Sequence, residues 1–154
     1  MSAPSEKSVI FCTECGALNG VPHGSDLTQG KCGSCKAPLS TAKPRKIDDA
    51  QFDRLRARDT GAYIIDLWAP WCGPCRMMAP HFDAASKTFA SDVRFFKLNT
   101  EIHRLAPGKL GIRGIPTLLA MKDGRQVELM AGALQGNAMT DWVASRFDVT
   151  PHAS

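Results

Sequence analysis

The pattern of hydrophobic and polar residues changes near residue 40. Beyond that point, dense apolar runs of strand length alternate with segments whose apolar residues recur at helical spacing. Strands are predicted at 63–68, 93–98, 117–121 and 126–130, and helices at about 48–60, 72–90, 101–110 (in part) and 136–147. The apolar run 63–68 is typical of a strand covered on both faces, and Asp123-Gly124 is a strong hairpin signal. The alternation predicts an α/β domain, with a mixed central sheet flanked by helices on both faces.

The first 40 residues follow a different pattern. They hold four of the six cysteines, five glycines and one aromatic residue, Phe11. The stretch 41–47 that follows contains Pro44 and is predicted to be a linker. We therefore expect a small module over 1–40, a linker over 41–47, the α/β domain over 48–148 and a tail over 149–154.

Composition and charge narrow the class of protein. Hydrophobic residues make up 44% and charged residues 22%, as in a soluble globular protein. No run approaches the roughly 20 apolar residues of a membrane helix, so a membrane is not an expected partner. The N-terminus lacks the features of a signal peptide, so the expected location is cytoplasmic. The net charge is +4, with none of the excess in residues 1–40, which gives no footprint for nucleic acid.

Four of the cysteines have the spacing of a metal site. The pairs Cys12/Cys15 and Cys32/Cys35 are sixteen residues apart, as in a structural zinc site with two knuckles. Four thiolates with no open position suit a structural Zn²⁺. A module of forty residues with few apolar side chains needs such a metal to fold. The alternative is a disordered tail with oxidisable thiols.

The third pair lies in Cys72-Gly73-Pro74-Cys75, directly after the predicted buried strand and at the start of a helix. A thiolate is the nucleophile of disulfide exchange, and the N–H groups and dipole of a helix N-terminus favour it. We expect Cys72, at the cap, to be the exposed attacking thiol, and Cys75, one turn inside, to be the resolving thiol. Half of a metal site is the alternative, but no other cysteine remains to complete it.

Two motifs carry a family resemblance. Trp71-Cys72-Gly73-Pro74-Cys75 matches the thioredoxin active-site motif, and Gly111-Ile112-Arg113-Gly114-Ile115-Pro116-Thr117 matches the second signature of that family. From about residue 47 to 147 the chain resembles the thioredoxin family, and its N-terminal cysteines make it similar to the zinc-binding bacterial thioredoxin-2 class. The resemblance implies a thioredoxin fold with an N-terminal zinc-ribbon-like module, one structural Zn²⁺ and no organic cofactor. It also implies a protein-disulfide reductase that acts on oxidised protein substrates and is re-reduced by an NADPH-dependent thioredoxin reductase.

The same resemblance implies roles for residues around the pair. Asp66 matches the buried aspartate that takes the proton of the resolving thiol, and Lys97 matches the lysine beside it. Without the family, Asp66 is equally well an aspartate on a solvated strand face, and Lys97 is more often just a solvated strand residue. Pro116 matches a cis proline that leaves the backbone of Ile115 free to pair with an extended substrate. The expected substrate-binding residues are Trp71, Gly73, Pro74, Ile115, Pro116 and Gly132.

Other functions are compatible with parts of the sequence. Oxidation of the four N-terminal cysteines could release zinc, unfold residues 1–40 and expose a surface for unfolded clients, which would make the module a redox sensor. A nucleic-acid-binding zinc ribbon is not expected, because residues 1–40 are neutral and have a single aromatic residue. An oxidase or isomerase can share the fold, but Gly73-Pro74 resembles the reducing members.

Overall fold

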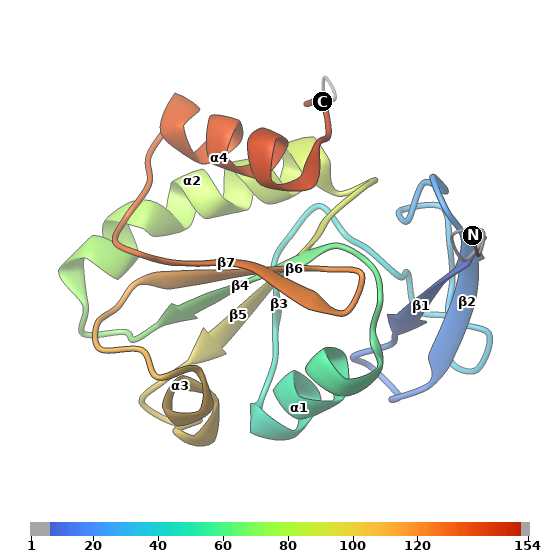
Figure 1. Cartoon of the computed structure of the whole chain (residues 1–154), viewed down its shortest axis with the longest axis horizontal. Helices are drawn as coiled ribbons and strands as arrows, with labels where there is room; N and C mark the ends of the chain where they lie inside the picture. The colour runs from blue at the N-terminus through green and yellow to red at the C-terminus, as the bar shows by residue number, and fades with distance from the viewer. Residues whose placement is uncertain (1–6, 152–154) are drawn as a thin grey trace.

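The computed structural model describes residues 7–151. Residues 1–6, part of the N-terminus expected to lack a signal peptide, and residues 152–154 of the expected tail lie outside the described residues. The described chain forms a two-stranded antiparallel sheet and a five-stranded mixed sheet with four helices (Figure 1). Within residues 7–151, no helix has both the length and the apolar character needed to span a bilayer.

The five-stranded sheet has the strand order β3-β5-β4-β6-β7. Its strands are β3 (Arg45–Lys46), β4 (Tyr63–Trp68), β5 (Arg94–Asn99), β6 (Thr117–Lys122) and β7 (Arg125–Ala131). The central strand β4 is parallel to β5 and antiparallel to β6. The predicted hairpin joins β6 to β7, and both Asp123 and Gly124 have positive φ angles, as its tight turn requires.

Helices cover both faces of this sheet, which confirms the predicted architecture. They are α1 (Asp49–Arg58), α2 (Gly73–Phe89), α3 (Leu105–Leu110) and α4 (Asn137–Phe147). Figure 1 shows α2 and α4 on one face and α1 and α3 on the other. A capping box starts α1, in which the Asp48 carboxylate accepts the backbone N–H of Gln51 and the Gln51 side chain accepts the N–H of Asp48.

The alternation of side chains along β4 divides the core into two layers. Ile64 packs with residues of α2 and α4 in one apolar cluster. Tyr63, Ile65 and Leu67 pack with α1 and α3 in the other. Asp66 has the parity of Ile64 and therefore lies on the side of α2.

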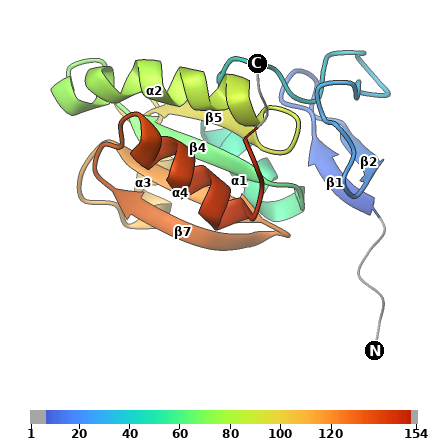
Figure 2. The same ribbon diagram turned by 90° about the horizontal axis from the view of Figure 1, so that it is seen from above.

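The N-terminal part pairs β1 (Lys7–Phe11) with β2 (Leu18–Pro22) and is followed by loops. It packs where β4 begins and α2 ends. The backbone N–H of Leu27 donates to the carbonyl of Ser91, and the Ser40 hydroxyl donates to the carbonyl of Ala90. Because α2 starts at the other end of β4, the N-terminal part and the dithiol lie at opposite ends of the sheet (Figures 1 and 2).

Two features of this region differ from the sequence expectations or go beyond them. The segment 41–47, in which no regular element was expected, contains β3, whose two residues pair with β5 in parallel. In addition, the side chain of Phe11, at the end of β1, packs in the α1/α3 core layer with Phe52 and Leu55 rather than with the apolar residues of the N-terminal part.

A buried ion pair lies at the junction between the N-terminal part and the α/β domain. Arg94 and Asp59 are both buried, and Nη1 of Arg94 lies 2.6 Å from Oδ2 of Asp59. The same carboxylate accepts the backbone N–H of Phe11 at 2.8 Å and that of Gly61 at 2.8 Å. One carboxylate thus joins β1, the turn before β4 and the start of β5.

Candidate active site and metal site

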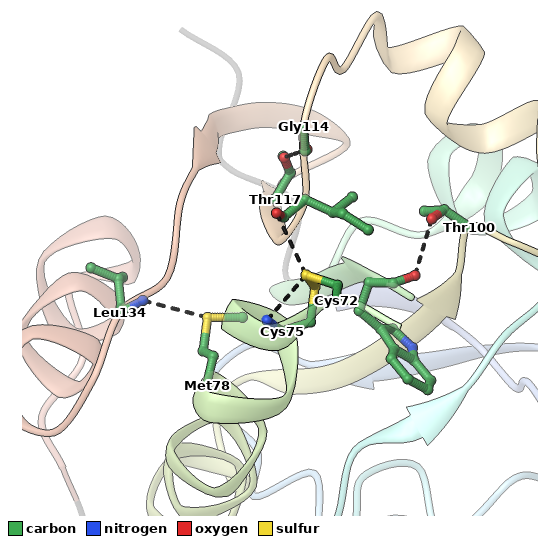
Figure 3. Close-up of a disulfide and its surroundings, with 9 residues drawn as sticks. Cys72, Cys75, Met78, Thr100, Gly114, Thr117 and Leu134 are labelled. Atoms are coloured by element: carbon green, nitrogen blue, oxygen red, sulfur yellow. Dashed lines mark hydrogen bonds between the residues drawn. A yellow bond between two sulfur atoms is a disulfide. The ribbon is translucent and has the colours of Figure 1, made fainter. Parts of the chain in front are cut away.

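The cysteine pair occupies the start of α2. Cys72 is the N-cap residue, and Gly73 and Pro74 form the first helical positions. The Sγ of Cys72 accepts the backbone N–H of Cys75 at 3.2 Å, and the two cysteines form a disulfide (Figure 3). This is the geometry in which the amides of a helix N-terminus stabilise a sulfur anion once the disulfide is reduced.

The expectation that Cys72 is exposed is wrong for this disulfide state. The exposed fraction is only 4% for Cys72 and 2% for Cys75, because Trp68, Ala69 and Ile115 pack around the two cysteines. Cys72 nevertheless borders a surface hollow of about 550 Å³. A partner disulfide that enters this hollow meets Cys72 rather than the deeper Cys75.

The second signature lies against the dithiol. The Ile115–Pro116 peptide bond is cis. The carbonyl oxygen of Ile115 is 3.7 Å from Cys72 Sγ, and the Thr117 hydroxyl donates to the Gly114 carbonyl and holds the turn (Figure 3). Gly132 donates its backbone N–H to the Pro116 carbonyl at 2.9 Å. Its φ of +106° is in the region that favours glycine.

Trp71 extends from this surface into solvent, with 67% of its area exposed. It lines the hollow together with Gly73, Pro74 and Ile115. Four of the six residues expected to bind substrate therefore share one concave surface. The other two, buried Pro116 and exposed Gly132, do not line the hollow but are joined to each other by a hydrogen bond.

Asp66 is the buried acid of the site, with 1% of its surface exposed. Neither carboxyl oxygen has a hydrogen-bond partner among the described residues. Burial raises the pKa of Asp66 to about 7, against the opposing charge of Lys97 and with a smaller contribution from Asp83 of α2. A carboxyl group that titrates near neutral pH can accept or release a proton under ordinary conditions.

Lys97 is the neighbour of Asp66 across the β4–β5 ladder. Its Nζ lies 4.6 Å from the centre of the Trp68 ring, where the ring face attracts the ammonium group. The Trp68 carbonyl accepts the hydroxyl of Thr100 (Figure 3). As ladder neighbours, Asp66 and Lys97 lie side by side on the face of the sheet that α2 covers.

The other four cysteines form a compact cluster in which all four sulfur atoms lie within 4.8 Å of one another. Cys12 and Cys35 are 3.6 Å apart at their sulfurs, and Cys15 and Cys32 are 3.5 Å apart. A tetrahedral site with Zn–S bonds of about 2.3 Å places its sulfurs about 3.8 Å apart. The donor set and its spacing fit a four-thiolate zinc centre.

Both knuckles have the same backbone pattern. The N–H of Cys12 donates to the Ala17 carbonyl, and Gly16 donates back to Cys12. Cys32 and Ala37 repeat the first bond, and Lys36 donates to the Cys32 carbonyl. The side chain of Asn19 in β2 accepts the N–H of Gly33, which ties the second knuckle to the small sheet.

Sequence reasoning missed part of the hollow. Thr100, Pro107 and Arg113 also line it, although no role was assigned to them. Arg113 lies within the second signature, but the motif alone does not say that this residue lines the hollow. Thr100 and Pro107 reach the site only because β5 and α3 place them there.

The fold and this site define a thiol–disulfide oxidoreductase: a dithiol caps a helix, a cis proline faces it and a buried carboxyl group lies below. Residues 43–145 match the family model for thioredoxin. The chain belongs to the thioredoxin family.

Individual relatives agree with this assignment. The chain is 35% identical over 135 residues to thioredoxin C-3 of Corynebacterium nephridii, a match that spans 88% of this chain and 92% of that protein. It is 37% identical over 97 residues to the thioredoxin of Haemophilus influenzae, across 63% of this chain and 91% of that one. Among solved structures, a mutant thioredoxin from Halobacterium salinarum superposes with a TM-score of 0.62 at 27% identity, over 73% of this chain and 97% of that one.

Proposed function

We propose that this thiol–disulfide oxidoreductase acts as a protein-disulfide reductase with Cys72 as its nucleophile. The Cys72 thiolate attacks a substrate disulfide, joins one substrate sulfur and displaces the other as a thiolate. Cys75 then attacks Cys72 Sγ and releases the second substrate thiolate. The substrate gains two electrons, and the enzyme is left with the Cys72–Cys75 disulfide. The observation that carries this proposal is the Cys72 sulfur at the N-cap of α2, 3.2 Å from the amide nitrogen of Cys75.

Asp66 is proposed to take the proton of the Cys75 thiol in the second step. Its burial on the α2 side of β4 and its pKa of about 7 support this role, because a carboxylate with that pKa is a competent base at neutral pH. Lys97 opposes the rise in the Asp66 pKa, so it adjusts the fraction of Asp66 that is ionised.

The substrate is proposed to lie as an extended segment along Ile115 and Pro116. Trp71, Gly73 and Pro74 would line its path, and Gly132 would leave room behind the cis proline. The exposed hollow beside Cys72 and the Ile115 carbonyl 3.7 Å from the sulfur support this placement. Oxidised proteins are the substrate class that such an open surface fits.

The electrons for the next cycle are proposed to come from an NADPH-dependent thioredoxin reductase, because the chain contains no glycine-rich dinucleotide-binding motif. A cytoplasmic location is proposed with it, since a reducing compartment keeps such a dithiol reduced.

The two active-site cysteines provide a matched pair of test variants. With Cys75→Ser, the mixed disulfide with an oxidised substrate such as insulin should accumulate and be visible on a non-reducing gel. With Cys72→Ser, neither the mixed disulfide nor insulin reduction should be detected. Insulin reduction by Cys72→Ser at the parent rate would exclude the proposed mechanism.

The four clustered cysteines are proposed to bind one structural Zn²⁺. When bound, the ion would supply cross-links that the small apolar cluster around Ile10 and Leu39 does not provide. Purified protein should contain about one zinc per chain by elemental analysis. Cys32→Ser should lose the metal, whereas Cys72→Ser, the matched control, should keep it. Metal loss from the Cys72 variant together with retention by the Cys32 variant would contradict the assignment.

A redox-sensing role of the same cluster is a second candidate, favoured by the exposure of Cys15 and Cys35. Each peroxide molecule would take two electrons from a pair of thiolates and be reduced to water. The two sulfurs would form a disulfide, and the loss of these thiolate ligands would release the ion. Titration with peroxide in the presence of a zinc-sensitive dye tests this role. Retention of zinc after the Cys72–Cys75 pair is fully oxidised would argue against it.

A further inference from the structure

The hollow beside the dithiol has walls of two kinds. Most of its lining is apolar or uncharged, with Trp71, Pro107, Ile112 and Ile115 supplying apolar surface. Among the described residues that line it, Arg113 is the one with a charged side chain. An apolar surface with one charged group favours one register of a ligand, because an opposite charge on the ligand pairs with that group at one position only.

The guanidinium group of Arg113 is available to a partner. It is exposed, and within residues 7–151 it makes no hydrogen bond or ion pair. The other bases of the preceding segment are engaged: Lys109 forms an ion pair with Asp53, and Arg104 donates to the carbonyl of Glu101. Arg113 is thus the one charged residue among the described residues that line the hollow, and no described residue pairs with it.

The position of Arg113 along the chain sets the register. The Ile115 carbonyl lies 3.7 Å from Cys72 Sγ, so a substrate segment beside Ile115 brings its cysteine to that sulfur. Arg113 lines the same hollow two positions before Ile115. An arginine side chain spans about 6 Å, which is about two residues of an extended substrate at roughly 3.3 Å per residue.

We propose that Arg113 selects substrate disulfides that carry an aspartate or glutamate about two residues from the attacked cysteine. This inference rests on the proposed reductase function and specifies its substrate class. Docking removes water from the apolar walls, and this strengthens the attraction between the guanidinium and a carboxylate. With Lys109 paired to Asp53, the segment 100–116 still holds Arg104 and Arg113 against one acid, Glu101, so its field favours the approach of acidic segments.

Three synthetic peptides test the proposal. All three contain the same intramolecular disulfide. They differ only at the position two residues away from each cysteine, which is glutamate, glutamine or lysine. The kcat/KM for each peptide is measured with the full-length, zinc-loaded and pre-reduced protein. It is then divided by the rate constant for reduction of the same peptide by dithiothreitol alone, which removes differences in the intrinsic reactivity of the peptide disulfides. For the parent protein, we expect the glutamate peptide to exceed the glutamine peptide about fivefold, the upper range for an exposed ion pair, and the lysine peptide to be slowest. Raising the salt to about 1 M should remove most of this preference.

Substitutions of Arg113 should change the preference itself. Arg113→Gln should bring the glutamate-to-glutamine ratio close to one, and Arg113→Glu should make the lysine peptide the best of the three. Arg125→Gln, an exposed arginine on the β6–β7 hairpin, is the matched control and should keep the ratio of the parent.

The outcomes separate this inference from the proposed function. A parent ratio near one, or a ratio that Arg113→Gln leaves unchanged, overturns the selection by Arg113 while the reductase function stands. Failure of the parent protein to reduce any of the peptides removes the reductase proposal, and the inference with it.

Discussion

Asp66→Asn is expected to stabilise the oxidised protein, and to do so more strongly as the pH rises. Asp66 is 1% exposed and its carboxyl oxygens have no hydrogen-bond partner among the described residues, so its ionised form is poorly accommodated. The folded-state pKa is about 7, against the ordinary aspartate pKa of 3.8. Between these values the native state binds the proton that the unfolded state has lost, so the parent becomes less stable as pH rises from about 4 to about 7. Above pH 7 the loss is complete.

The size of the effect follows from the pKa difference. One pKa unit corresponds to about 1.4 kcal/mol, so the total loss is about 4 kcal/mol at pH 8.5 and about 2 kcal/mol at pH 5.5. Asparagine has a similar shape and does not ionise. The free energy of unfolding of Asp66→Asn should therefore exceed that of the parent by these amounts.

Urea unfolding of the oxidised protein, followed by tryptophan fluorescence at several pH values, measures this difference. Each comparison is made between parent and variant at the same pH, so that protonation of the four clustered cysteine thiols affects both alike. Asp53→Asn is the control, because Asp53 forms an exposed ion pair and has no comparable burial. A difference that is constant between pH 5.5 and 8.5, or a parent that is more stable than Asp66→Asn at pH 8.5, would contradict the predicted cost of ionising Asp66.

Two further predictions concern the junction of the N-terminal module with the α/β domain. Asp59→Asn should lower the free energy of unfolding by about 3–5 kcal/mol in urea titrations, because it leaves the buried Arg94 without its counter-charge. The control is Asp53→Asn, which breaks the exposed ion pair with Lys109 and should lower the free energy of unfolding by less than about 1 kcal/mol. Gly61→Ala should cost about 1–3 kcal/mol by the same assay, because the added Cβ would lie 2.5 Å from Nη2 of Arg94 and 2.5 Å from Cδ1 of Ile10. Gly108→Ala, whose added methyl group meets no atom within 4 Å, is the control, and an equal loss in both variants would argue against this explanation.

The parts of the fold that could be predicted are those with a strong local signal. The β4 run, the Asp123-Gly124 turn and the amphipathic helices placed most elements of the α/β domain within one or two residues of their observed limits. The exception is α3, which begins at Leu105 rather than near residue 101. The spacing of the four N-terminal cysteines likewise predicted their cluster.

The missing parts depend on contacts between distant residues. The two residues of β3 have no periodicity and are a strand only because β5, about fifty positions later, pairs with them. Asp59 and Arg94 are 35 positions apart, and nothing near either residue indicates a buried pair. The burial of Cys72 similarly follows from the packing of Ile115, which the helix-cap argument does not include.

The insertion of Phe11 into the α1/α3 layer has a consequence for the boundary of the redox unit. The family model begins at residue 43, yet the hydrophobic interior of that unit is completed by a side chain 32 positions earlier. A chain trimmed to residues 43–145 would present an open apolar notch beside Phe52 and would leave the Asp59 carboxylate short of one of its amide donors. The limits of the family model alone therefore understate where the folding unit of this protein starts.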